Sequence, residues 1–210
     1  MDDSSTARKS ERLRRFYDTS AADYDRWMRV YDRLLLGDGR RRICSRASGQ
    51  TLELAIGTGL NLAFYPRDVP LTGIDRSSAM LDIAVRRARE LGRAVDLRLG
   101  DALSLDFPDD SFDTVVSTLL LSTIPKDRCA ATEALRVLKP GGQLLVLDHV
   151  QSPVRPVRWA ERFLDPVMTR LTGDHLLRDP LDYLVAVGFC IERWDRSRWG
   201  MVEEVVAQKP

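Results

Sequence analysis

A short apolar stretch of the sequence leads into two glycines that are separated by one residue. The stretch 51–56 reads TLELAI, Gly57-Thr58-Gly59 follows it directly, and the stretch itself contains an acid, Glu53. Glycines at such a position allow a turn with positive φ and let a ligand approach the backbone without meeting a Cβ atom. A strand that leads into a glycine-rich turn is a common way to bind an anionic or nucleotide ligand. The residues therefore predict a ligand site at the end of the first strand.

Acidic residues stand where the next two predicted strands end. Asp75 lies sixteen residues after Gly59, and Asp101 follows Gly100 at the end of the third strand. The first carboxylate can accept hydrogen bonds from both hydroxyls of a ribose, as an acid about twenty residues beyond the glycines does in dinucleotide-binding folds. The second can accept from the exocyclic amine of an adenine. A single Asp at a strand end is usually a helix cap or a turn former, so it is the ordered set that favours an adenosine-containing ligand.

Three features distinguish among such ligands. Leu62 stands where NAD- and FAD-binding folds have a third glycine. Asn61 stands where the following helix would begin, whereas a pyrophosphate prefers a bare helix N-terminus. Glu53 would repel a pyrophosphate but could orient an ammonium group. A phosphate-free ligand made of an adenosine and an amino acid, S-adenosylmethionine, satisfies all three conditions.

The elements that must position these residues alternate between strands and helices. Apolar runs predict strands at 51–56, 70–75, 94–101, 112–121 and 141–150. Helical spacing predicts helices at 60–65, 78–91, 127–138 and around 157–171. Two last strand-like runs, FCIERWD and MVEEVVAQ, are split by RSRWG and predict an antiparallel hairpin. We therefore expect an α/β fold with a doubly wound, Rossmann-like, mostly parallel seven-stranded sheet that ends in an antiparallel C-terminal hairpin.

The N-terminal region carries aromatic residues at helical spacing. Residues 1–10 are polar and small and predict a disordered tail, and residues 11–210 are expected to form a single domain. Within that domain, residues 11–36 predict a helical lid over the ligand, with a break near Thr19–Ser20 where Ser20 could cap a second helix. A helix pair packed on the core is the alternative.

Composition excludes several classes of partner. Lys and Arg number 32 against 31 Asp and Glu, so there is no basic excess of the kind that indicates a nucleic acid or a membrane surface. No apolar run approaches the ~20 residues that span a bilayer, and the N-terminus does not resemble a secretory signal. The three cysteines are far apart and form no C-x-x-C pair, which argues against disulfides or a zinc site. We expect a cytoplasmic protein with a small-molecule partner, no nucleic acid, no integral membrane segment and no metal, either a monomer or a homodimer.

Four stretches occur in the order of the successive motifs of one enzyme family. They are LELAIGTGLN, GIDRSSAMLDIA, LGDALSLDFPDDSFDTVVSTLLL and EALRVLKPGGQLLVLDHV. From about Glu11 onward the sequence resembles class I S-adenosylmethionine-dependent methyltransferases. Further stretches, among them FYDTSAADYDRW and GTGLNLAFYP, resemble the quinone and phospholipid methyltransferase branch and the related animal thiol S-methyltransferases. The family usually has glycine two residues after the acid of the first motif, and this chain has Ala55 there.

The resemblance also implies which part of the donor each position would bind. The turn and the acid before it would hold the methionine moiety: Glu53, Ala55, Gly57, Thr58, Gly59 and Asn61. The ends of the second and third strands would hold the adenosine: Asp75, Arg76, Met80, Asp101 and Ala102. The floor beneath the sulfonium and the lid above it would complete the site: Thr118, Leu119, Tyr17 and Tyr24.

The acceptor side is expected to be aromatic and apolar, which favours a small, largely hydrophobic acceptor with an oxygen, nitrogen, sulfur or carbon nucleophile. The expected lining is Tyr17, Trp27, Tyr31, Leu120, His149, Phe163 and Met168. Methyl transfer from a sulfonium depends mainly on alignment and needs a base only if the acceptor must lose a proton. His149 at the end of the fifth strand is the candidate catalytic base, with packing as its alternative role, and His175 is a second acceptor-side candidate.

Two other functions stay open from the sequence. A non-catalytic S-adenosylmethionine-binding regulatory protein would keep the donor turn. A nicotinamide-dependent reductase would need the third glycine and a Y-x-x-x-K pair, and this sequence has neither.

Overall fold

The computed structural model describes residues 3–124, 127–171 and 180–210 of the chain. Its helices are α1 (Asp3–Tyr31), the π-helical segment η1 (Asp32–Leu36), α2 (Gly39–Cys44), α3 (Ser78–Glu90), α4 (Asp127–Val137), α5 (Arg155–Leu171) and α6 (Pro180–Val187). Its strands are β1 (Thr51–Leu54), β2 (Leu71–Asp75), β3 (Asp96–Leu99), β4 (Phe112–Thr118), β5 (Leu138–His149), β6 (Cys190–Ser197) and β7 (Val202–Gln208).

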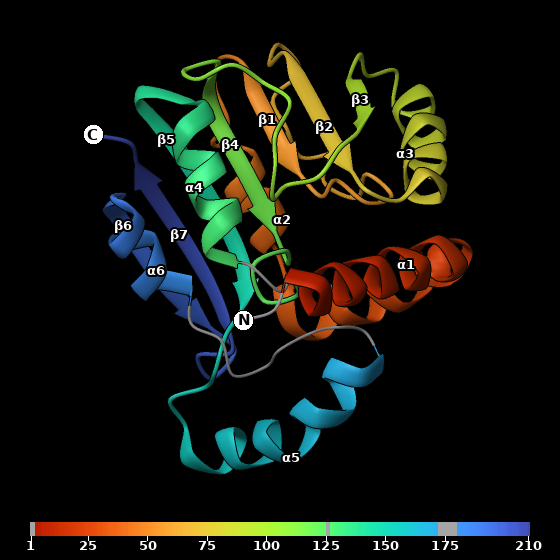
Figure 1. The fold of residues 1–210 in the computed structure, drawn as a ribbon, viewed down its shortest axis with the longest axis vertical. Helices are drawn as coiled ribbons and strands as arrows, with labels where there is room; N and C mark the ends of the chain where they lie inside the picture. The colour runs from red at the N-terminus through yellow and green to blue at the C-terminus, as the bar shows by residue number, and fades with distance from the viewer. Residues whose placement is uncertain (1–2, 125–126, 172–179) are drawn as a thin grey trace.

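The strands form one seven-stranded sheet in the order β3-β2-β1-β4-β5-β7-β6. β1 to β5 are mutually parallel, and β7 pairs antiparallel with both β5 and β6. The expected mostly parallel sheet with an antiparallel C-terminal hairpin is therefore confirmed. Since β1 lies between β2 and β4, the residues after these three strands meet at one edge of the sheet, and Figure 1 shows α1 crossing that edge.

Both faces of the sheet are covered, because successive side chains of the central strands point to opposite faces. In β5, Leu144 and Val146 pack in a core with α4 and α6, whereas Leu145 and Leu147 pack in a second core with α2 and α3. All four side chains are fully buried. This is the reason that the parallel strands read as continuous apolar runs in the sequence.

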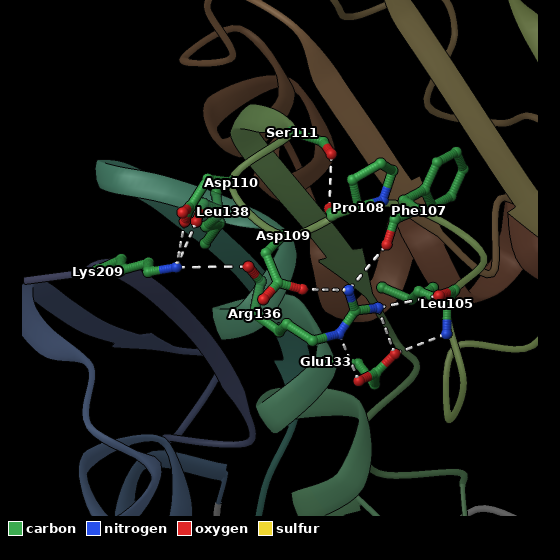
Figure 2. A network of polar contacts seen from close by, with 10 residues as sticks. All are labelled: Leu105, Phe107, Pro108, Asp109, Asp110, Ser111, Glu133, Arg136, Leu138 and Lys209. Atoms are coloured by element: carbon green, nitrogen blue, oxygen red, sulfur yellow. Dashed lines mark hydrogen bonds and ion pairs between the residues drawn. The ribbon is translucent and has the colours of Figure 1, made fainter.

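A network of charged groups holds the segment between β3 and β4 (Figure 2). The Arg136 guanidinium on α4 donates to the carbonyl oxygen of Leu105 at 2.9 Å and to the carboxylates of Asp109 at 2.8 Å and Glu133 at 2.9 Å. Glu133 in turn accepts from the Leu105 amide at 2.7 Å, and Lys209 near the C-terminus reaches the carbonyl of Leu138 at 2.6 Å. The loop that begins at the end of β3 is thereby fixed to α4.

The N-terminal region differs from the prediction. α1 is one continuous helix from Asp3 to Tyr31, so it has no break at Thr19–Ser20, and most of the expected disordered tail is helical. Ser20 does not cap a helix: its hydroxyl donates to the carbonyl of Phe16 one turn earlier at 2.8 Å, and Thr19 bonds in the same way. Hydroxyls satisfied inside the helix do not interrupt it. The start of α1 carries Asp and Ser residues, which are favoured in a first turn.

One further element prediction was wrong, and one helix was not predicted. Residues 60–65 form successive turns rather than a helix, with the amides of Leu62 and Phe64 donating to the carbonyls of Gly59 and Asn61. The segment is short and Pro66 follows it, so a helix would have little to gain by forming. The sequence reading also missed α6, whose short apolar run supplies the buried Leu184.

Candidate functional site

The turn after β1 uses its residues with positive φ for different purposes. Ala55, Gly57 and Gly59 have φ values of 50°, 57° and 78°. A Cβ added at Gly59 would lie 2.7 Å from the Leu62 side chain, so this glycine is required for packing. A Cβ added at Gly57 would meet nothing closer than the Ala55 carbonyl oxygen at 4.0 Å. Gly57 therefore leaves open space in front of the backbone, as the close approach of a ligand requires.

Asp75 ends β2 and connects the turn to the next helix. Its carboxylate accepts from the amide of Gly57 at 2.9 Å and from the amide of Ser77 at 2.8 Å. Ser77 caps α3 by accepting from the Met80 amide at 3.2 Å. Burial raises the pKa of Asp75, and the backbone hydrogen bonds oppose that effect. Each carboxylate oxygen retains a further lone pair for a ligand hydroxyl.

Asp101 follows β3 and faces the same space. One oxygen accepts from the Leu103 amide at 3.0 Å, and the other lies 3.5 Å from the Arg76 guanidinium. Asp75 and Asp101 line a single cavity together with Ala102. The structure thus brings together the two acids that the sequence places at neighbouring strand ends.

Most of the predicted donor-site residues line this main cavity. They are Tyr17, Tyr24, Ala55, Gly57, Asp75, Arg76, Met80, Asp101, Ala102, Thr118 and Leu119. A smaller cavity continues from it past Tyr24, Gly57 and Thr118, and it is lined in addition by Glu53, Thr58 and Asn61. Gly59 lies behind the turn and lines neither cavity.

The smaller cavity contains a buried chain of polar groups. Asn61 donates to Glu53 at 2.7 Å and to the Thr118 hydroxyl at 2.9 Å, and its oxygen accepts from Arg40 at 2.9 Å. Arg40 is buried and also bonds Asp32 at 3.0 Å. Burial raises the pKa of Glu53 to about 7. An acid and a guanidinium joined through one amide match the opposite charges of an amino-acid zwitterion.

Arg40 is a member of the site that is not among the residues predicted from the sequence. Its side chain turns inward from the short helix α2, where it meets Asn61, twenty-one residues away along the chain. Arginines are almost never fully buried unless they are paired. No local signal in the sequence distinguishes Arg40 from the exposed Arg41 and Arg42 beside it.

α1 covers the main cavity and is tied to the turn. Its Tyr17 and Tyr24 rings pack edge to face with centroids 6.1 Å apart, and both line the cavity. The Asp25 carboxylate of α1 accepts from the Thr58 hydroxyl at 2.6 Å and pairs with Arg87 of α3. Arg87 also donates to the Thr58 carbonyl at 2.5 Å. Three segments that are distant in the sequence therefore meet at Thr58.

The candidate base lies apart from these cavities. His149 is buried at the end of β5, and within the described residues it lines neither cavity. Burial lowers its pKa to about 4. The preceding Asp148 accepts from the amides of Leu121 and Ser122 at 2.8 and 3.2 Å, so it fixes the loop after β4.

The residues expected on the acceptor side are dispersed. Leu120 and Tyr17 line the main cavity, and Tyr31 packs against the core that contains α2 and α3. Trp27 and Phe163 are instead exposed to solvent. The Met168 side chain and His175 lie outside the described part of the structure.

Comparison with known sequences identifies relatives of this chain. Residues 52–146 match the family described as "Methyltransferase domain". A phosphatidylethanolamine N-methyltransferase of Cereibacter sphaeroides is 36% identical over 155 residues, which cover 70% of this chain and 76% of that protein. A 2-phytyl-1,4-naphtoquinone methyltransferase of Synechococcus elongatus is 34% identical over 152 residues, 64% of each chain. A ubiquinone/menaquinone biosynthesis C-methyltransferase of Paracoccus denitrificans is 35% identical over 155 residues, 68% of this chain but only 60% of that protein.

Solved structures give the same fold. A S-adenosylmethionine-dependent methyltransferase from Thermotoga maritima, described as a possible histamine N-methyltransferase, superposes with a TM-score of 0.73 at 18% identity, covering 94% of this chain and all of that one. The [4+2]-cyclase SpnF superposes with a TM-score of 0.67 at 26% identity, covering 83% of this chain and 80% of that one. The matched domain and these relatives show that this chain belongs to the methyltransferase family.

Proposed function

We propose that this protein binds S-adenosylmethionine and transfers its methyl group to a small, largely hydrophobic acceptor. The observation that carries the proposal is one cavity lined by the open Gly57, by the carboxylates of Asp75 and Asp101, and by the tyrosines of α1. The donor supplies, when bound, a methyl group that is already activated by a sulfonium. The protein has mainly to hold the reactants in line, which contributes up to ~7–11 kcal/mol.

Each part of the cavity matches one part of the donor. Asp75 would accept hydrogen bonds from the ribose hydroxyls, and Asp101 would accept from the adenine amine. Glu53 would face the ammonium group, and Arg40, held by Asn61 and Asp32, would balance the carboxylate. Thr118 and Leu119 would line the space beneath the sulfonium.

The main cavity also has apolar residues in its lining. Its lining includes Leu13, Leu103, Leu120 and Ile124. An apolar wall of this kind favours an acceptor with a hydrophobic body. The relatives named above act on phosphatidylethanolamine and on a phytyl-substituted naphthoquinone, and we extend the same chemical class to this chain.

A base is required only for acceptors that must lose a proton. His149 stays our candidate although it lines neither of the two cavities described above, because its lowered pKa keeps the imidazole neutral at neutral pH. A lowered pKa also makes it a weak base. An acceptor that is nucleophilic without deprotonation is compatible with the site as well.

Calorimetric titration of the purified protein tests the donor assignment. We expect binding of S-adenosylmethionine and S-adenosylhomocysteine, and no binding of NAD. Asp75→Asn should weaken donor binding, and Asp96→Asn on the edge strand β3 is its matched control. Asp96 is exposed and pairs with Arg98, so its substitution should leave donor binding unchanged. Binding of NAD alone would overturn the proposal.

Transfer of a labelled methyl group tests the enzymatic part. The acceptor panel contains phosphatidylethanolamine, a prenylated naphthoquinone, an alkyl thiol and an aromatic amine, and we expect turnover with at least one of them. The SpnF likeness shows that this fold also supports other reactions. Donor binding without turnover across the panel would favour the non-catalytic regulator.

A further inference from the structure

α5 exposes three large apolar side chains to solvent. Trp159 and Phe163 lie one turn apart and are each 74% exposed, and Leu164 is 49% exposed. The acidic Glu161, between them in sequence, is buried. An amphipathic helix of a globular protein normally buries its apolar side and exposes its charges. α5 is oriented in the opposite way.

Specific hydrogen bonds hold this orientation. The Glu161 carboxylate accepts from the Ser152 amide at 2.9 Å, and the Ser152 hydroxyl donates to the carbonyl of Trp199 at 2.6 Å. Ser152 also accepts from the Val154 amide at 3.1 Å, and Arg158 donates to the Pro153 carbonyl at 2.7 Å. The polar edge of α5 is therefore anchored to the loop after β5, so the outward position of the aromatic side chains is built into the fold.

The outward face combines aromatic and cationic groups. The α5 sequence contains four arginines and two acids, and one of these acids is the buried Glu161. Arg155 and Arg162 are exposed on the helix. A helix with Trp, Phe and Leu on one face, Arg beside them and low average hydrophobicity is the type that lies in the interface of a lipid bilayer. The net charge of +1 for the whole chain conceals this local excess.

A second row of exposed apolar side chains begins on α1. Trp27, Val30 and Leu34 follow one another at helical spacing from α1 into η1, and all three are exposed. Arg26, Arg29 and Arg33 beside them are exposed as well. Figure 1 shows α1 across the carboxyl ends of the parallel strands and α5 beyond it at the same end of the molecule. Both rows therefore lie at the end of the sheet that carries the cavity.

We propose that α5 docks the protein on the surface of an anionic lipid bilayer. Trp159, Phe163 and Leu164 would enter the headgroup region, and Arg155 and Arg162 would pair with lipid phosphates. A second copy of the chain fits this face less well, because a symmetric contact through α5 would bring its arginines against one another. None of the helices in the described ranges has the length and apolarity needed to cross a bilayer, so the contact would be peripheral. This docking role rests on the proposed function for its purpose, because it would bring the cavity to a hydrophobic acceptor in the membrane.

Vesicle co-sedimentation of the full chain tests the proposal. The vesicles are made of phosphatidylcholine either alone or with 30% phosphatidylglycerol, a composition chosen for the experiment. We expect binding to the anionic vesicles, at least tenfold weaker binding to the neutral ones, and a loss of binding at high salt. The double variant Trp159→Ser/Phe163→Ser should bind the anionic vesicles at least tenfold more weakly than the wild type. The control Leu99→Ser/Val185→Ser removes two other exposed apolar side chains and should bind like the wild type.

Three results would overturn the docking role: no binding of the wild type to anionic vesicles, equal binding to neutral and anionic vesicles, or unchanged binding of the Trp159/Phe163 variant. The docking role would also be overturned if sedimentation velocity without lipid showed a dimer of the wild type and a monomer of this variant. Donor affinity, measured calorimetrically without vesicles, should be unaltered in the variant, which also reports that it is folded. Vesicle binding without donor binding would refute the proposed function and leave the docking role intact, and donor binding without vesicle binding would do the reverse.

Discussion

Glu53 is an acid buried inside β1, and its ionisation has a cost that can be measured. Burial raises its pKa from 4.5 to about 7. Because the pKa of Glu53 is higher in the folded than in the unfolded state, the folded state binds more protons between the two pKa values. The free energy of unfolding therefore falls as the pH rises through that window. At about 1.4 kcal/mol per pH unit, the full effect is about 3 kcal/mol. Most of it develops between pH 5 and pH 8.

Glu53→Gln removes the charge and keeps the shape of the side chain. The amide oxygen can still accept the 2.7 Å hydrogen bond from Asn61. In urea unfolding of the donor-free protein, the variant should therefore gain stability relative to the wild type by about 2–3 kcal/mol when the pH is changed from 5 to 8. Glu90→Gln, at the exposed end of α3, is the control and should show no such change. If the two proteins differ equally at pH 5 and pH 8, the reasoning about burial is wrong.

The same substitution should act in the opposite direction on ligand binding. If Glu53 faces the ammonium group of the donor, loss of its charge should weaken S-adenosylmethionine binding about tenfold or more at pH 8, because a charge-assisted interaction contributes about 1.5–3 kcal/mol. Calorimetry at pH 8 measures this effect. A variant that is more stable and binds less tightly is the expected signature of an acid kept for function at the expense of stability. Unchanged affinity would reduce Glu53 to a structural role.

The remaining predictions concern the turn, the lid and the candidate base. Asp75→Asn should weaken binding of both S-adenosylmethionine and its demethylated product by about ten- to a hundredfold, measured calorimetrically, since the ribose hydroxyls lose a charged acceptor; equal affinities would contradict the ribose assignment. Ala55→Gly relieves a positive-φ cost of about 1–2 kcal/mol, whereas the greater freedom of glycine in the unfolded chain costs about 0.4–1 kcal/mol. Urea unfolding should therefore show a net stabilisation of about 0.5–1 kcal/mol, and a destabilised variant would refute the strain. Asp25→Asn breaks the pair with Arg87, so protease should cleave α1 faster and the donor should dissociate faster, whereas an unaltered cleavage rate would show that α1 is held by other contacts. If His149 is the base, its pKa of about 4 predicts that the wild-type kcat stays level from pH 5.5 to 8. His149→Gln should then lower kcat without changing donor affinity, and a wild-type kcat that declines toward pH 6 would exclude this base.

The sequence predicts the parts of the site that depend on strand order. Residues at the carboxyl ends of neighbouring parallel strands must lie close together, and for this reason Gly57, Asp75 and Asp101 could be assigned to one place before any contact was known. The apolar strands also predict burial on both faces, which the alternation of Leu144 and Leu145 between the two cores confirms.

Contacts between distant segments could not be predicted in this way. Arg40 and Arg41 are neighbours of the same type, and it is Arg40 that turns inward, where it bonds Asn61 and Asp32. Likewise, the helical spacing of α5 shows that it is amphipathic, but the bond from Ser152 to Glu161 is what accompanies the outward position of Trp159 and Phe163. Local pattern specifies the element, whereas the partners of its polar groups specify its orientation.

The polar contacts around Thr58 indicate how the site opens. α1 is held over the turn by Asp25, which bonds the Thr58 hydroxyl and pairs with Arg87, and both charged side chains are partly exposed. Partly exposed ion pairs contribute about 1 kcal/mol or less, so this tie can break often enough for a ligand to enter and a product to leave. Asp75, by contrast, is buried and holds the turn through two backbone amides. The donor turn should therefore keep its shape while α1 moves, and the lid rather than the turn should limit exchange of the donor.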